Sequence, residues 1–161
     1  MNLLDQLNLV EYDLMSQLGN IHGSIENRNI MILKLNISAK YARIHKSYHD
    51  VYHSDQNGEA LKRAIFLQWY AASEPMAFIG IGDLDDNVQK SCFTFLKDMI
   101  DKLGLDGEFK TMLKHYYSVS EWYFEHYFDF SKISSYTEAS KKLLDFENRG
   151  QMGKYWRSLN K

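Results

Sequence analysis

The sequence predicts an all-α protein, a single-domain bundle of about six helices that run mostly antiparallel, up and down. Three observations predict this fold class. Apolar residues recur every three or four positions along most of the chain, which is the spacing of helices that bury one face. One proline and nine glycines in 161 residues are too few for the tight turns of a sandwich or barrel. The connections between the expected helices are short, which favours antiparallel neighbours.

Residues 1–161 are expected to form one domain. Hydrophobic residues make up 45% and charged residues 25% of the chain, the balance of a globular protein, which excludes disorder for most of its length. The lone cysteine, Cys92, excludes an intrachain disulfide and a multi-cysteine zinc site. A net charge of −2 gives no reason to expect general nucleic-acid binding.

The first two helices are expected over residues 3–19 and 24–53. Asn2 can cap the first helix and Gly19 can end it. The apolar stripe of the first helix consists of Leu3, Leu7, Val10, Leu14 and Leu18. The stripe of the second consists of Ile30, Leu33, Ile37, Tyr41, Ile44, Tyr48 and Val51. Residues 54–58, with the sequence SDQNG, form the clearest turn in the chain.

The third helix is expected over residues 59–73 and is apolar on nearly all sides, which is typical of a central element. Pro75 is expected to kink or end it. The apolar stretch 64–81 approaches the length of a membrane span, but polar residues interrupt it, so no span is expected. The N-terminus has no basic segment typical of a secretory signal, and a cytoplasmic location is expected.

The remaining helices are expected over residues 86–104, 106–130 and 135–149. Capping residues precede or begin each of them, and Cys92 lies on the apolar stripe of the first of the three. The tail after Gly150 is expected to add one further turn.

Three histidines, His45, His49 and His53, are spaced by four on the second helix. A pair at this spacing can ligate one metal ion, so His45 and His49 are the candidate metal ligands. The competing interpretation is a hydrogen-bonded, partly exposed flank of the helix. The zinc-protease pattern HExxH is absent, because Lys46 follows His45.

A second candidate group lies on the helix expected over 106–130. His115, Val119, Trp122 and His126 form a flank separate from the core stripe. Such a flank could line a pocket or anchor a partner, since tryptophan and tyrosine are enriched at interface hot spots. The alternative is that these aromatic residues belong to the core.

Gln68 and Glu74 interrupt the apolar central helix and form the third candidate group. A buried carboxylate must find a partner or keep its proton. We therefore expect Gln68 and Glu74 to lie close to each other or to a histidine, in a small polar pocket. The alternative is that Glu74 reaches water where the helix ends at Pro75.

Arg43 and His49 are separated by five residues on one helix. This spacing resembles the Arg-x(4–6)-His element of HEPN ribonucleases, helical bundles that usually dimerise to pair their sites. The resemblance covers seven residues, and Ile44 stands where the family frequently has a polar residue. It implies a ribonuclease as one version of an enzymatic function.

No catalytic motif stands out, so the sequence favours a non-enzymatic interaction or regulatory module, of the adaptor or toxin-neutralising type. Such a module is expected to bind a protein partner or to self-associate, and no cofactor is expected. One alternative is a metal-dependent or acid–base enzyme using His45, His49 and Glu74. Another is a binder of a small ligand in an aromatic-lined core.

The charge is uneven along the chain: residues 1–27 hold four acids and no Lys or Arg, whereas residues 131–161 hold seven basic and three acidic residues. These ends form solvated faces or attract each other or a partner.

Overall fold

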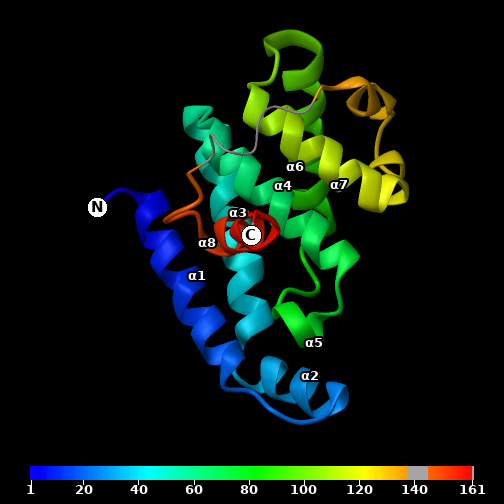
Figure 1. Ribbon diagram of the computed structural model, residues 1–161. Helices are drawn as coiled ribbons and strands as arrows, with labels where there is room; N and C mark the ends of the chain where they lie inside the picture. Colours follow the sequence, from blue (N-terminus) through cyan, green and yellow to red (C-terminus); the bar gives the residue numbers. More distant parts are fainter. Residues whose placement is uncertain (138–144, 161) are drawn as a thin grey trace.

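The fold is that of a computed structural model, which describes residues 1–137 and 145–160 (Figure 1). The protein is all-helical, with 77% helix and no strand in the described part of the chain, which confirms the predicted class. Its elements are α1 (Leu3–Gly19), α2 (Ile25–Lys34), α3 (Ile37–Asp55), α4 (Gly58–Ser73), α5 (Met76–Ile79), α6 (Asp86–Asp98), the π-helical turn η1 (Met99–Leu103), α7 (Gly107–Glu125), the 3-10 helix η2 (Ser131–Ser135) and α8 (Gly150–Leu159).

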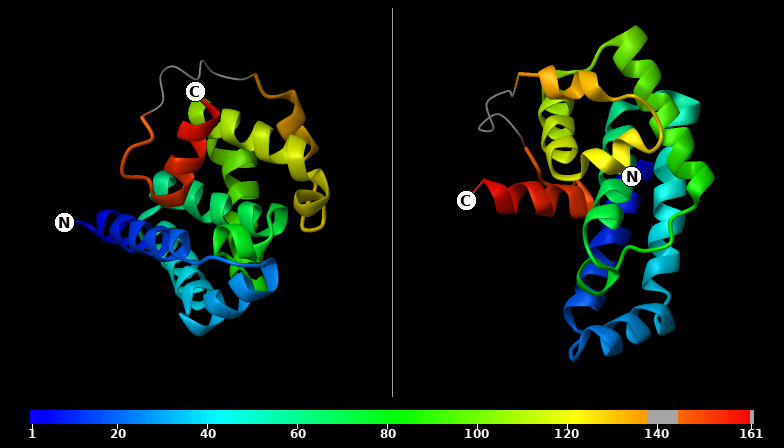
Figure 2. Two further views of the ribbon diagram at one scale, coloured as in Figure 1. Left: turned by 60° about the horizontal axis from the view of Figure 1, so that its bottom comes forward. Right: turned by 90° about the vertical axis from the view of Figure 1, so that its right-hand side faces the viewer.

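The helix α4 forms the centre of the molecule and packs against α3, α6, α7 and α8 (Figures 1 and 2). Every residue from Ala60 to Trp69 is buried, as its apolar composition predicts. The helix ends at Ser73, and Glu74 is extended before Pro75. The predicted end at Pro75 is confirmed, because proline disfavours helical backbone in the residue before it and offers no N–H.

The helix α1 has the predicted bounds, but its buried face differs from the predicted stripe. Asn2 caps it as expected. Leu3 and Val10 are exposed, and Asn8 and Glu11 are buried in their place. The two polar residues are buried because they contact α8, a tertiary partner that periodicity alone does not reveal.

The prediction of one continuous helix over residues 24–53 is wrong. The helix α2 ends at Lys34, and Asn36 adopts the left-handed conformation with φ of 57° before α3 begins at Ile37. Asparagine tolerates this conformation better than most residues. As a result Ile30 and Leu33, predicted to share a buried stripe with Ile37, are 55% and 56% exposed.

The C-terminal part departs most from prediction. The helix α6 extends through η1 and ends at Gly104 as expected, but α7 ends at Glu125 rather than near residue 130. Within the range 135–149 expected to be helical, residues 136–137 and 145–149 are not helical, and residues 138–144 lie outside the described residues. The tail forms the helix α8 rather than a single turn. Gly150 begins this helix, although it was expected to follow the end of the preceding one.

The helix α8 packs against α1 and α4 and is seen end-on in Figure 1, while α1 and α3 lie nearly in the plane. The helix α8 therefore crosses the direction of α1 and α3. None of the helices in the described part of the chain combines the length and the apolar character needed to cross a bilayer.

Candidate functional site

The structure places Gln68 in a buried chain of hydrogen bonds that joins four helices. Gln68 Oε1 lies 2.9 Å from Nε2 of His45 on α3. Its Nε2 donates to the backbone carbonyl of Gln89 on α6, at 3.2 Å. The Gln89 side chain in turn accepts a hydrogen bond from the hydroxyl of Tyr123 on α7. The prediction that Gln68 lies near a histidine is confirmed for His45.

This chain determines which ring nitrogen of His45 carries the proton. Because the amide nitrogen of Gln68 faces a carbonyl, its oxygen must face the imidazole, so His45 donates from Nε2. Burial lowers the pKa of His45 to about 4, outweighing the opposite effect of the Gln68 hydrogen bond. His45 is therefore neutral at neutral pH and connects α3 to α4 inside the core.

His49 and His53 lie on the same helix but nearer the surface. His49 Nδ1 is 2.8 Å from Asp50 Oδ1, and its Nε2 is 2.7 Å from the hydroxyl of Ser91 on α6. The His49 and His53 rings stack at 6.1 Å between centroids. Both ring nitrogens of His49 thus have protein partners. This arrangement fits the interpretation of the three histidines as a hydrogen-bonded flank of the helix.

Glu74 does not join this group. It is exposed at the end of α4, so its expected position in a polar pocket inside the bundle is wrong. Burial raises the pKa values of Tyr70 and Tyr155, and the charge of Glu74 adds to the rise in both. Gln68, by contrast, faces α3 and α6. Six helical positions separate the two residues, and Pro75 lets Glu74 reach water.

The aromatic flank of α7 is divided in two. Nε2 of His115 lies 2.6 Å from the Tyr155 hydroxyl, within an aromatic cluster that includes Trp69 and Trp156. Trp122, by contrast, is 64% exposed, and His126 is exposed as well. The structure therefore separates His115 from the outer part of the flank.

No group of three or more His, Cys, Asp or Glu side chains in the described part of the chain is arranged to hold a metal ion. Arg43, the other half of the HEPN-like element, is exposed on α3. His49, six residues later, points to α6 and bonds Ser91. Among the described residues, none is hydrogen-bonded to both Arg43 and His49.

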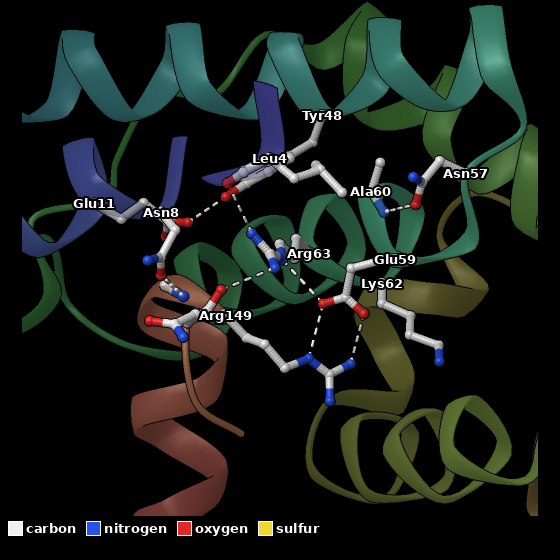
Figure 3. Close-up of polar contacts among 12 residues, drawn as sticks. Leu4, Asn8, Glu11, Tyr48, Asn57, Glu59, Ala60, Lys62, Arg63 and Arg149 are labelled. Atoms are coloured by element: carbon white, nitrogen blue, oxygen red, sulfur yellow. Dashed lines mark hydrogen bonds and ion pairs between the residues drawn. The ribbon is translucent and has the colours of Figure 1, made fainter. Parts of the chain in front are cut away.

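A second buried polar network lies around α4 and was not predicted (Figure 3). Glu59 accepts two hydrogen bonds from Arg149, at 2.8 and 2.7 Å, and one from Arg63 at 2.9 Å. Arg149 also donates to Glu108 on α7, which Lys62 contacts at 3.0 Å. This network ties the residue preceding α8 to α4 and α7.

Glu11 extends the polar contacts to the N-terminus of α8 (Figure 3). It accepts a hydrogen bond of 2.5 Å from Tyr48 and one of 3.2 Å from the backbone N–H of Gln151. Asn8 accepts from the N–H of Gly150 at 2.8 Å. Two residues of α1 thereby cap α8, whose own N-cap residue makes no side-chain capping bond.

The Glu11 carboxyl is fully buried, and its pKa is raised to about 7 by that burial, against the lowering effects of Tyr48, the Gln151 N–H and Arg63. A Cβ atom at residue 150 would lie 2.1 Å from Glu11 Oε2, so only glycine fits there. One sequence feature could have revealed this acid: Glu11 lies on the same face as Leu7, Leu14 and Leu18.

Several exposed apolar side chains lie on α2. This helix is at one end of the molecule (Figures 1 and 2). Ile32 is the only buried residue of this helix. On the outward side Ile30 is 55% and Leu33 56% exposed. Glu26 and Lys34 lie one turn before and after Ile30, both exposed and without a hydrogen-bonding partner in the described part of the chain. These four residues are called the α2 face below.

No family model matches the chain, and neither the curated proteins nor the solved structures include a significant match.

Proposed function

We propose that this protein is a self-associating interaction module, and that the α2 face binds the same face of a second copy. The observation that carries this proposal is the exposure of Ile30 and Leu33, which lie three positions apart on α2. Neighbouring exposed apolar residues bordered by charges are typical of interaction sites. The break at Asn36 turns both side chains away from the core, although a continuous helix was expected to bury them.

The order of residues along α2 favours a second copy as the occupant. Glu26, Ile30 and Lys34 follow one another at intervals of four and share one stripe of the helix. If two α2 helices pair antiparallel about a two-fold axis at Ile30, each Glu26 faces the partner's Lys34 and the two Ile30 side chains meet. A two-fold interface requires such self-complementarity, and this helix has it.

The size of the surface predicts a weak dimer. Ten residues of helix are about 15 Å long. This length cannot supply the roughly 800 Å² per partner of a standard stable interface. We therefore expect dissociation constants of about 10–500 µM, as for transient complexes.

Sedimentation velocity from about 1 µM to 1 mM tests the proposal, a range chosen to bracket that affinity. The parent protein should shift from monomer to dimer, and Ile30→Lys should stay monomeric. Glu26→Lys and Lys34→Glu should each weaken the dimer by about threefold to tenfold, because each variant places like charges opposite each other. The double variant with both changes should recover the dimer, since each swapped charge again meets its opposite.

Lys90→Glu on α6 is the matched control, an exposed lysine remote from α2, and should leave the dimer unchanged. A monomeric parent at all concentrations would overturn the second copy as occupant, as would a dimer that Ile30→Lys does not affect. Failure of the charge-swapped double variant to recover would reject the antiparallel pairing. An adaptor or toxin-neutralising role in the cytoplasm is compatible with this proposal and belongs to it as an expectation.

A further inference from the structure

A pocket of about 300 Å³ lies between the C-terminal end of α1, the first turn of α2, the end of α4, α5 and α8, and its lining shares no residue with the α2 face. Met15 of α1 and Phe78 of α5 contribute apolar walls. Tyr70 of α4 and Tyr155 of α8 contribute aromatic ones, with ring centroids 5.3 Å apart in an edge-to-face arrangement. Its volume and aromatic lining are typical of sites for small organic molecules.

One lining residue of this pocket carries a buried polar atom that the protein does not satisfy. Gln151 lines the pocket and is only 7% exposed. Its Nε2 donates to the carbonyl of Ile79 at 3.4 Å, whereas its buried Oε1 has no hydrogen-bond partner in the described part of the chain. Buried acceptors without a partner are uncommon and unfavourable, so a ligand that donates a hydrogen bond there would remove a cost.

The charged groups of the lining are both positive. Lys154 is exposed at the pocket and makes no ion pair or hydrogen bond within the described residues. Arg28 is held by backbone carbonyls, donating through Nε to Ala77 at 2.9 Å and also to Ile21. No acidic residue lines the pocket. Glu74, whose charge adds to the raised pKa values of Tyr70 and Tyr155, is not one of the lining residues.

We propose that this pocket binds a small aromatic carboxylate that carries an N–H or O–H donor. The carboxylate would pair with Lys154 and Arg28, the ring would pack against Tyr70 and Tyr155, and the donor would reach the acceptor of Gln151. Each of these three interactions answers a separate feature of the lining: charge, aromatic surface and an unsatisfied acceptor.

Indole-3-acetate is the probe, because it combines a carboxylate, a flat ring and one N–H. Titration followed by ¹H–¹⁵N NMR should show saturable binding with a dissociation constant below about 1 mM. The shifts should concentrate in α8, α5 and the end of α1. Two analogues separate the interactions: the methyl ester removes the charge, and benzofuran-3-acetate removes the donor. Both should bind about fivefold more weakly.

Lys154→Met should weaken the probe by about fivefold, the effect of a partly exposed ion pair. Arg157→Met is the matched control, an exposed cation on the same helix that does not line the pocket. Gln151→Met should abolish the preference for the indole over the benzofuran while the shifts of the other residues show that the fold is kept. Absence of saturable binding up to about 5 mM, or binding that Lys154→Met leaves unchanged, would overturn the proposal. Ile30→Lys leaves the pocket lining intact, so failure of self-association and failure of this pocket are distinguishable.

Discussion

Two buried titratable residues show how single side chains couple this fold to pH. Glu11 keeps its proton up to about pH 7, and His45 loses its proton already near pH 4. Both shifts arise mainly from burial, which disfavours the charged form of either group. The two residues affect stability with opposite signs, because one is an acid and the other a base.

Between about pH 4.5 and 7 the unfolded chain has released the Glu11 proton and the folded protein still holds it, so stability falls as pH rises. Between about pH 4 and 6.5 the unfolded chain holds a proton on His45 and the folded protein does not, so stability rises with pH. The two effects offset each other in the parent protein over their shared range.

We expect Glu11→Gln to remove the decrease in stability with rising pH that the Glu11 proton causes. The stability of this variant relative to the parent should therefore increase from pH 4.5 to 7, by at most about 3 kcal/mol. His45→Gln should do the reverse and lose stability relative to the parent from pH 4 to 6.5. Urea denaturation at several pH values measures both. Parallel stability curves for the three proteins would contradict the raised and lowered pKa values.

At the scale of an element, the break between α2 and α3 decides what the surface presents. Leu35 and Asn36 interrupt a periodic apolar pattern that would otherwise continue through both helices. The left-handed backbone of Asn36 redirects the chain, and Ile30 and Leu33 then face outward. The proposed α2 face therefore depends on the conformation of one residue.

Asn36→Gly should change the free energy of unfolding little, because glycine adopts the left-handed conformation readily. Asn36→Ala should destabilise the protein by about 1 kcal/mol, since a Cβ without a polar group disfavours that conformation. Chemical denaturation compares the two variants. Equal free energies of unfolding for the two variants would show that the left-handed backbone at residue 36 is not unfavourable for alanine.

At the scale of the whole molecule, buried polar contacts join segments that are distant in sequence. Arg149 bridges Glu59 and Glu108, and its own side chain is only 10% exposed. The hydrogen bonds on Arg149 and Lys62 lower the pKa of Glu108, although burial by itself would raise it. The carboxylate is thus held ionised among cations, and α8 is fastened to the helices around α4.

Removing one member of such a buried network leaves the others unpaired. Arg149→Met should therefore cost about 3 kcal/mol of stability, with the earliest loss of amide protection in α8. Lys46→Met is the comparison, since the Lys46–Asp50 pair is exposed on both sides and its loss should cost less than about 0.5 kcal/mol. Equal effects of the two substitutions would show that the network contributes no more than a surface ion pair.

The sequence by itself determined the features that arise within one or two helical turns. Asn2 and Asp106 cap helices as expected, because each side chain reaches an N–H only three residues away. The central position of α4, its end at Pro75 and the burial of Cys92 follow from local composition and periodicity. These features need no distant partner.

The burial and the hydrogen-bond partners of the polar residues depend on contacts between segments that are distant in sequence. The contact of Asn8 with Gly150 spans 142 positions, and that of His45 with Gln68 spans 23. Glu74 and Glu11 are the same type of residue, yet Glu74 is exposed and Glu11 is buried. The sequence had pointed to Glu74 as the buried acid. A polar side chain can be buried wherever another segment supplies its hydrogen bonds, and periodicity within one helix does not record which segments will meet.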